Sequence, residues 1–357
     1  MTDPLLAALA RVQDPEIRRP ITELDMVRDA VVVDGVARID LRLTIVGCPA
    51  ADRIERDVRA AASGVEGVRA VELTIGVMTP AEREALVTRL RGTRLQQFGP
   101  DTLTKIFAIT SGKGGVGKST LTANLAVALA APAPDGPGLR VGLVDADVFG
   151  FSIPGILGVA GAVPTRVGDM ILPPIAHGVK VISIGMFVEP STAVSWRGPL
   201  LHRTLQQFLT DVWFGDLDVL LLDLPPGTGD IAISLGQLLP HAEVVVVTTP
   251  QPAAADVAER SGLVARQTGQ TVIGVVENMS GGVFGSGGGA ALAERLGVPE
   301  LATVPLSGAL REDGDAGSPA VLAHPADPAS VAITQVAATL ASRARGLAGK
   351  PLPFSPR

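Results

Sequence analysis

The sequence has few of the residues on which several classes of protein depend. One cysteine stands among 357 residues, so the chain cannot form an internal disulfide bond, and we expect it to reside in the reducing cytoplasm. Tyrosine is absent and there are two tryptophans, which leaves few aromatic platforms on which the bases of a single-stranded nucleic acid could stack. No apolar run approaches the length of about eighteen residues that a membrane span needs, and the first residues lack the basic stretch of a secretory signal. These absences predict a soluble protein without a membrane partner.

Positive charge is also scarce. The formal net charge is −6, and acidic and basic side chains are spread over both halves of the chain, so we expect no nucleic-acid partner. Arginine supplies most of the positive charge, with 25 residues against five lysines. Two of those five, Lys113 and Lys118, lie together in one short glycine-rich segment, which a general drift in composition does not explain.

That glycine-rich segment follows an apolar stretch and is the most informative part of the sequence. Residues 105–120 read KIFAITSGKGGVGKST, and the spacing Gly-x-x-x-x-Gly-Lys-Ser is that of a phosphate-binding loop. Its glycines let the backbone turn tightly and direct N–H groups at phosphate oxygens, while a helix predicted over 121–131 points its positive end at the same anion. Lys118 would reach the β- and γ-phosphates, and the Ser119 hydroxyl would bind Mg²⁺. The expected nucleotide-binding residues are Gly112, Lys113, Gly114, Gly115, Val116, Gly117, Lys118, Ser119 and Thr120.

The apolar pattern divides the chain into two domains. We expect a small α/β domain over 1–91, a linker over 92–104 that is rich in Gly, Gln, Arg and Thr, a phosphate-loop ATPase domain over 105–346, and a tail over 347–357.

The pattern of the first domain predicts a short helix over 5–12, a hairpin that turns at Asp34-Gly35, a helix over 50–62, a strand over 68–77 and a helix after Pro80.

The pattern of the second domain alternates strand and helix. This alternation predicts an α/β fold in which a mostly parallel sheet is flanked by helices and the nucleotide binds at the carboxyl ends of the strands. The predicted strands lie near 105–110, 140–145, 179–184, 218–223, 243–249, 271–277 and 301–304.

Aspartates follow two of these apolar strands. Asp145 and Asp147 end the first strand, and Asp223 ends the second in a Walker B arrangement. Hydrolysis of a phosphoanhydride needs a held Mg²⁺ and an aligned water, and carboxylates at these places could supply both. Gly227 follows Asp223 closely, and a glycine there can present its N–H to a γ-phosphate and move when that phosphate leaves.

The identity of the base is less constrained by the residues. The guanine-specific Asn-Lys-x-Asp motif is absent, which favours adenine. Asn278, at the end of the strand predicted over 271–277, is a candidate to hydrogen-bond the base, although an ordinary turn residue is the simpler interpretation of that position alone.

Several blocks of sequence give the chain a resemblance to the Mrp (ApbC-like) family of iron–sulfur cluster carriers, which are deviant Walker A ATPases. Asp223-Leu-Pro-Pro-Gly-Thr-Gly-Asp230 is the most specific of these blocks. The others are residues 110–120, 145–154, 196–200, 248–251 and 277–280. The resemblance implies an ATP-sandwich homodimer in which Lys113, the signature lysine, reaches the nucleotide of the facing subunit.

The same resemblance assigns roles to the residues around the phosphates. It implies that Asp147 aligns the attacking water, that Asp145 and Asp223 serve the Mg²⁺ shell together with Ser119, and that Asn278 reads adenine. Lys113, Lys118 and Asp147 are therefore the expected catalytic residues.

Residues 1–91 resemble the small domain found in bacterial Mrp proteins and in SufT-like assembly factors. Asp14-Pro-Glu16 and Thr44-Ile-Val-Gly-Cys-Pro49 carry this part of the resemblance.

The chain departs from the Mrp pattern at one place. Many members carry a Cys-x-x-Cys pair after the block at 277–280, and two subunits then hold one [4Fe–4S] cluster, whereas this chain has only glycine-rich sequence over 281–289. A [4Fe–4S] cluster usually takes four thiolates, and a dimer of this chain offers two, both Cys48. The glycines predict either a mobile loop or a plain linker at the start of a helix.

Cys48 has two interpretations. It precedes Pro49 and a predicted helix, whose N-terminal field can lower the pKa of a thiol and favour the thiolate that binds metal. A lone cysteine is more often a small buried apolar residue, and the resemblance of the small domain brings the two interpretations level.

We therefore expect a cytoplasmic, Mg²⁺-dependent ATPase that acts as a homodimer in the delivery of iron–sulfur clusters to client apoproteins, with assembly factors as further partners. The missing cysteine pair leaves a second hypothesis open, a nucleotide-switched module that binds clients without a cluster, as ParA and MinD act through partners. Phosphoryl transfer to a small molecule is a third, weaker hypothesis, because no acceptor pocket is recognisable in the sequence.

Overall fold

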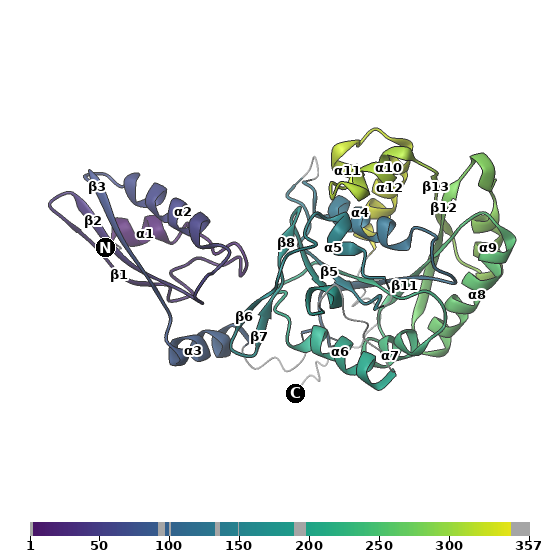
Figure 1. Cartoon of the computed structure of the whole chain (residues 1–357), viewed down its shortest axis with the longest axis horizontal. Helices are drawn as coiled ribbons and strands as arrows, with labels where there is room; N and C mark the ends of the chain where they lie inside the picture. The colour runs from purple at the N-terminus through teal and green to yellow at the C-terminus, as the bar shows by residue number, and fades with distance from the viewer. Residues whose placement is uncertain are drawn as a thin grey trace, which may run out of the picture. The chain divides into compact units, whose positions relative to one another are not determined.

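The computed structural model describes residues 3–91, 97–99, 101–132, 136–148, 150–188 and 198–343 (Figure 1). These residues form two compact units. The small unit comprises the described residues within Met1–Gln97, Val163–Pro174 and Leu209–Gly215, and the large unit comprises the other described residues. Part of the predicted linker, residues 149, 196 and 197 of two resemblance blocks, and the predicted tail lie outside the described residues.

The small unit contains a three-stranded sheet and helices. Its elements are α1 (Pro4–Leu9), β1 (Val27–Val33), β2 (Val36–Leu43), α2 (Ala51–Ser63), β3 (Ala70–Val77), α3 (Pro80–Arg91), β6 (Thr165–Val167) and β7 (Met170–Leu172). β1 pairs antiparallel with β2, and β2 pairs parallel with β3. Asp34 and Gly35 both have positive φ, at 51° and 77°, as a tight two-residue hairpin requires, so the predicted hairpin is confirmed. The first helix is shorter than predicted, because tighter i to i−3 hydrogen bonds from the N–H groups of Arg11 and Val12 end it at Leu9.

Two segments of the small unit come from the middle of the sequence. β6 and β7 form a hairpin whose Val167, Met170 and Leu172 are buried in the same apolar cluster as the N-terminal helices, and Trp213 packs against that cluster. The sequence prediction placed these segments in the second domain. They are too short to show a strand period, and their membership of this core depends on contacts between residues far apart in the chain.

The large unit has the predicted α/β fold. Its strands are β4 (Lys105–Ser111), β5 (Val141–Asp145), β8 (Ile175–Ala176), β9 (Val179–Ser183), β10 (Val219–Asp223), β11 (Glu243–Thr248), β12 (Thr271–Ser280) and β13 (Glu300–Pro305). Its helices are α4 (Lys118–Ala130), α5 (Ile153–Ile156), α6 (Gly198–Thr210), α7 (Asp230–Leu238), α8 (Pro252–Gln267), α9 (Gly288–Leu296), α10 (Gly308–Asp315), α11 (Ala320–Ala323) and α12 (Pro328–Ser342), with short 3₁₀ turns η1 (Ile184–Met186) and η2 (Gly282–Phe284).

The described strands of the large unit form one sheet in the order β13-β12-β11-β4-β10-β5-β9-β8. Neighbouring strands run parallel except β8, which pairs antiparallel with β9 at the edge. All the strands predicted from the apolar pattern are present. β8 was not predicted, because a two-residue strand has too few residues to show alternation.

Helices cover both faces of this sheet (Figure 1). Helices α4 and α12 pack on one face, where Val245 and Val247 of β11 join their core. Helix α8 packs on the opposite face, where Gly262 lies against the side chain of Val246. None of the helices in the described part of the chain combines the length and the apolar character needed to cross a lipid bilayer.

The parallel strands bring distant residues to one edge. β4 lies between β10 and β11, so Ser111, Asp223 and Thr248 end side by side. In the next strands outward, Asp145 ends β5 and Asn278 lies near the end of β12. Since the carboxyl ends of parallel strands meet at this edge, it is the place where such a sheet binds ligands.

The first glycine of the glycine-rich loop is fixed by packing against α8. A Cβ atom at Gly112 would lie 2.2 Å from the backbone N of Ala258 and from the backbone C of Val257. No side chain fits there without moving the helix backbone, so Gly112 sets how closely α8 approaches the loop.

Gly112→Ala should therefore lower the free energy of unfolding of the nucleotide-free protein by about 1–3 kcal/mol, the usual cost of overpacking. Urea denaturation would measure it. Gly114→Ala is the matched control, because a Cβ there meets nothing closer than Pro226 Cγ at 3.9 Å. Equal stability of the two variants would contradict this account of the packing.

Candidate functional site

The glycine-rich loop forms one wall of a cavity of about 340 Å³ at the carboxyl edge of the sheet. Gly115 and Gly117 have φ of 77° and 76°, a left-handed conformation that favours glycine, and α4 begins directly afterwards at Lys118. The loop therefore lies at the N-terminus of a helix, where backbone N–H groups and the helix dipole favour an anion. Asp147 and Pro226 line the other side of the cavity.

Asp223 is the buried partner of Lys118 and Ser119, two of the residues that line this cavity. Its carboxylate is fully buried and accepts hydrogen bonds from Lys118 Nζ at 2.7 Å and Ser119 Oγ at 2.6 Å, both on Oδ2. Thr122 Oγ1 donates to the other oxygen at 2.8 Å. Lys118 Nζ also lies 3.6 Å from Asp147 Oδ2, so one ammonium balances two carboxylates.

Asp145 lies beside this group without an ammonium of its own at hydrogen-bond distance among the described contacts. Ser183 Oγ donates to it at 2.9 Å and the Asp147 N–H at 3.2 Å. Burial, reinforced by the negative charge of Asp223, raises the pKa of the Asp145 carboxyl well above its usual range. A nearby divalent cation would favour the ionised form instead.

The donor set fits Mg²⁺. The Ser119 hydroxyl and the carboxylates of Asp145 and Asp223 are hard oxygen ligands, and Mg²⁺ in nucleotide sites is held by one or two carboxylates, waters and the phosphates. Among the described residues no group of three or more His, Cys, Asp or Glu could hold a metal by itself.

The two lysines of the loop differ in environment. Lys118 is buried in its contacts with the carboxylates, whereas Lys113 is exposed on the loop and its backbone carbonyl accepts a hydrogen bond from Ser111 Oγ. Lys113 is thus open to the surroundings of the large unit, and it forms no ion pair with the carboxylates that the structure describes.

Gly227 lies against the same loop. It has a φ of 93°, and its N–H donates to the carbonyl of Ser111 at 2.7 Å.

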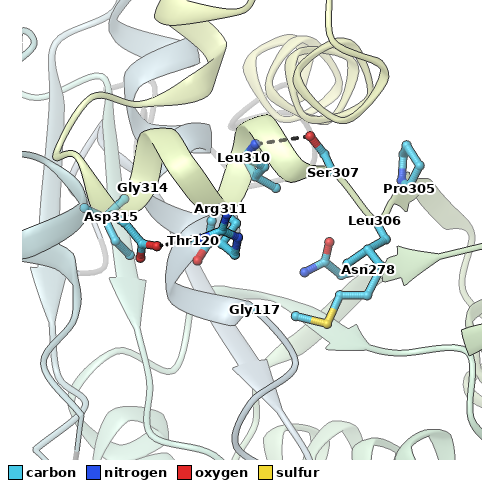
Figure 2. A pocket seen from close by; sticks show the side chains of 12 residues that line it. Gly117, Thr120, Asn278, Pro305, Leu306, Ser307, Leu310, Arg311, Gly314 and Asp315 are labelled. Carbon is cyan, nitrogen blue, oxygen red and sulfur yellow. Dashed lines mark hydrogen bonds and ion pairs between the residues drawn. The ribbon is translucent and has the colours of Figure 1, made fainter. Parts of the chain in front are cut away.

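Asn278 lines a second cavity of about 250 Å³ that continues from Gly117 and Thr120 (Figure 2). Its Nδ2 donates to the carbonyl of Val116 at 2.8 Å, which fixes the orientation of the amide and leaves Oδ1 as an acceptor. Such an acceptor suits the exocyclic amino group of adenine and would oppose the carbonyl of guanine.

The remainder of this cavity is mainly apolar. Met279, Pro305, Leu306 and Leu310 contribute to it, with Arg311 at one end beside Asp315 (Figure 2). Sequence reasoning missed the residues of β13 and α10, because no motif marks them and only the fold places them beside Asn278.

The glycine-rich segment over 281–289 is held at a helix start. Four of its glycines have positive φ, and α9 begins at Gly288. The buried Glu277 carboxylate accepts the N–H groups of Gly287 at 2.9 Å and Gly289 at 2.7 Å. Glu277 therefore caps α9, a role that the sequence analysis did not assign.

Cys48 lies in the small unit and is 6% exposed within its apolar core. Burial raises the pKa of the Cys48 thiol, and the charges of Glu16 and Asp14 act in the same direction. Hydrogen bonds from the N–H groups of Ala50 and Ala51 lower the pKa but do not outweigh burial. The N–H groups ahead of the helix thus lower the pKa as one interpretation of the sequence expects, but removal of the thiol from water outweighs them and the net shift is upward.

The small unit does bring together the two segments that carry the SufT-like resemblance. Asp14, which accepts the N–H groups of Glu16 and Ile17 at 2.9 and 2.7 Å, acts electrostatically on Cys48 together with Glu16.

A parallel sheet with a Gly-Lys-Ser loop, a buried strand-end aspartate and an adjoining apolar cavity defines a P-loop NTPase. Residues 102–341 match the family described as NUBPL iron-transfer P-loop NTPase, within ParA, and residues 2–73 match the family of iron-sulfur cluster assembly proteins. The chain belongs to the NUBPL-type iron-transfer P-loop NTPases. The resemblance to iron–sulfur cluster carriers inferred from its motifs is thereby confirmed.

The names of proteins similar in sequence agree with this family. The iron-sulfur cluster carrier protein of Mycobacterium tuberculosis is 51% identical over 369 residues, which cover 98% of this chain and 95% of that protein. The protein of the same name from Escherichia coli is 34% identical and covers 94% of this chain and 90% of its own length.

Two solved structures that contain nucleotide resemble part of this chain. A nucleotide-binding protein from Archaeoglobus fulgidus in complex with ADP has a TM-score of 0.52 and 35% identity over 60% of this chain and 86% of its own. The septum site-determining protein MinD from Pyrococcus horikoshii with Mg-ADP has a TM-score of 0.51 and 27% identity, and the match covers 70% of this chain and all of that one.

The environment of Cys48 gives a prediction for its reactivity. Because the thiolate is the reactive form, a raised pKa and burial should slow alkylation of native Cys48 at neutral pH by about tenfold or more relative to the unfolded chain. The rate should rise as the pH is increased toward the raised pKa. Mass spectrometry of iodoacetamide labelling, with and without urea, gives both rates, and Cys48 is the only cysteine in the sequence. Equal rates would contradict the assignment of a buried, protonated thiol.

Proposed function

We propose that the chain is a cytoplasmic, Mg²⁺-dependent ATPase that works as a homodimer and carries iron–sulfur clusters to client apoproteins. The observation that carries the ATPase part is the contact of Lys118 and Ser119, which line the cavity behind the glycine-rich loop, with the buried Asp223. The cluster part is supported by the family and by the names of its relatives.

Lys118 is the residue that phosphate binding would redirect. Its ammonium balances Asp223 and Asp147 here, and the β- and γ-phosphates would compete for it. Asp223 and Ser119 are then free to act as ligands of Mg²⁺, with Asp145 nearby in the ionised form. When bound, Mg²⁺ supplies neutralisation of the charge that develops on the phosphates.

Asp147 is the proposed residue for positioning the attacking water. It lies beyond the end of β5, its carboxylate lines the phosphate cavity, and it is 3.6 Å from the lysine that would hold the γ-phosphate. Gly227 would donate its N–H to the γ-phosphate from the facing loop, and Asn278 would hold the adenine. Exposed Lys113 is available to reach the nucleotide of a second subunit, which supports the homodimer.

The cluster is cargo in this proposal, and the one cysteine of each chain cannot supply all of its ligands. Two Cys48 thiols from a dimer would be supplemented by thiols from a client or a small molecule. Release of Cys48 from the apolar core of the small unit would have to accompany loading, because the buried thiol is held protonated.

The burial of Cys48 also favours a second candidate function. A nucleotide-switched module that binds client proteins and holds no cluster needs the phosphate loop, Asp147 and Gly227 but no free thiolate. It uses the same ATPase site, so the two candidates differ only in cluster binding.

Asp147→Asn should reduce ATP turnover by about 100-fold or more, the range expected for loss of a positioned acid–base group. ATP binding should be retained, since asparagine keeps the size of the side chain and removes a negative charge near the phosphates. Phosphate release and equilibrium binding of ATP would be measured in the presence of Mg²⁺. Asp29→Asn, an exposed position on β1, is the control, and unchanged turnover in Asp147→Asn would refute the site assignment.

Anaerobic reconstitution tests the carrier. Iron and acid-labile sulfide retained per dimer should approach one cluster in the native protein and fall in Cys48→Ala, with ATP turnover of the variant as the control for folding. If neither protein retains iron and sulfide, the carrier proposal fails and the cluster-free module takes its place.

A further inference from the structure

Ser261 lies in the interior of α8 and points toward the glycine-rich loop. It is 3% exposed, and its Oγ lies 3.2 Å from the carbonyl of Ser111 and 3.3 Å from the carbonyl of Gly227. A serine inside a helix commonly hydrogen-bonds a carbonyl of the preceding turn. This one donates away from its helix, to the strand that leads into the phosphate loop and to the loop after Asp223.

The hydroxyl has one hydrogen and two acceptors. The Ser111 carbonyl is also the acceptor of the Gly227 N–H at 2.7 Å, so Ser111, Gly227 and Ser261 share three hydrogen-bonding contacts among them. As arranged here, the Gly227 N–H is committed to Ser111 and is not directed at a phosphate.

The two carbonyls differ in their access to water. Ser111 is completely buried, whereas Gly227 is partly exposed. If the Gly227 N–H turned to a γ-phosphate, the Ser111 carbonyl would lose its shorter hydrogen bond in a place that water does not reach, and an unsatisfied buried acceptor is costly. The Gly227 carbonyl could instead be hydrated.

We propose that Ser261 is a positioning residue that keeps the Ser111 carbonyl hydrogen-bonded when the Gly227 N–H moves to the γ-phosphate. This inference rests on the proposed function, since it assumes that the site distinguishes ATP from ADP through Gly227. In the ADP-bound or nucleotide-free state the hydroxyl is shared between the two carbonyls. In the ATP-bound state it donates to Ser111 alone, so the switch leaves no buried carbonyl without a donor.

The close packing of α8 against the glycine-rich loop places the Ser261 hydroxyl within reach of both carbonyls. Gly112 brings the backbone of α8 against the loop at Ala258, and Ser261 lies three residues further along, on the same side of the helix. A serine at this position reaches both carbonyls without a bridging water.

The test is the ratio of affinities for a non-hydrolysable ATP analogue and ADP, measured by calorimetry on the full chain with Mg²⁺. Ser261→Ala should weaken binding of the analogue about tenfold, a loss of about 1.4 kcal/mol, and leave the affinity for ADP within about twofold. Ser261→Thr keeps the hydroxyl and should restore the native ratio.

Ser330→Ala is the matched control. Ser330 is also a buried serine within a helix, and its hydroxyl has no hydrogen-bond partner among the described residues, so neither affinity should change. An unchanged ratio in Ser261→Ala, or an equal loss for both nucleotides, would overturn the role of Ser261 while leaving the proposed ATPase intact. Failure of the native protein to bind either nucleotide would overturn the proposed function itself.

Discussion

The burial of the Asp223 carboxylate at the end of a central strand is the constraint on which the rest of the site depends. A buried charge is costly unless it is paired and hydrogen-bonded, and Asp223 receives Lys118, Ser119 and Thr122 from the first turn and a half of α4. This set of contacts fixes the start of α4 against β10, and with it the direction of the glycine-rich loop. The same contacts commit Lys118 to Asp223, so Asp145 has no ammonium at hydrogen-bond distance among the described contacts, and burial and the charge of Asp223 raise its pKa.

The two units are built on different principles. In the large unit, carboxylates, hydroxyls and backbone N–H groups converge on one edge of a parallel sheet. In the small unit the chemically distinctive group, Cys48, is enclosed by apolar side chains, and its burial suppresses the thiolate. The family is named for iron transfer. In this chain, however, the phosphate-loop residues line a cavity, whereas the one thiol lies in an apolar core with a raised pKa.

Sequence reasoning reached the features that depend on short, regular patterns. The strand period located the large sheet, the Asp34-Gly35 pair located the hairpin, and the Gly-Lys-Ser spacing located the phosphate loop, because each is determined within a few residues. Features that depend on distant contacts were out of reach. The pKa of Cys48 is set by the side chains that bury it, and the orientation of the Asn278 amide is set by the Val116 carbonyl. β6 and β7 belong to the small unit because they pack into a core formed by residues far earlier in the chain.

The adjacent residues Glu277 and Asn278 connect two parts of the large unit that sequence alone would treat as independent. Glu277 holds the N-terminus of α9 through the N–H groups of Gly287 and Gly289, and Asn278 holds the carbonyl of Val116 in the phosphate loop. One peptide bond thus joins the anchor of the glycine-rich turn to the anchor of the loop. The phosphate loop and the N-terminus of α9 are thereby fastened to consecutive residues of β12, so neither can shift relative to that strand without losing a hydrogen bond of Asn278 or Glu277.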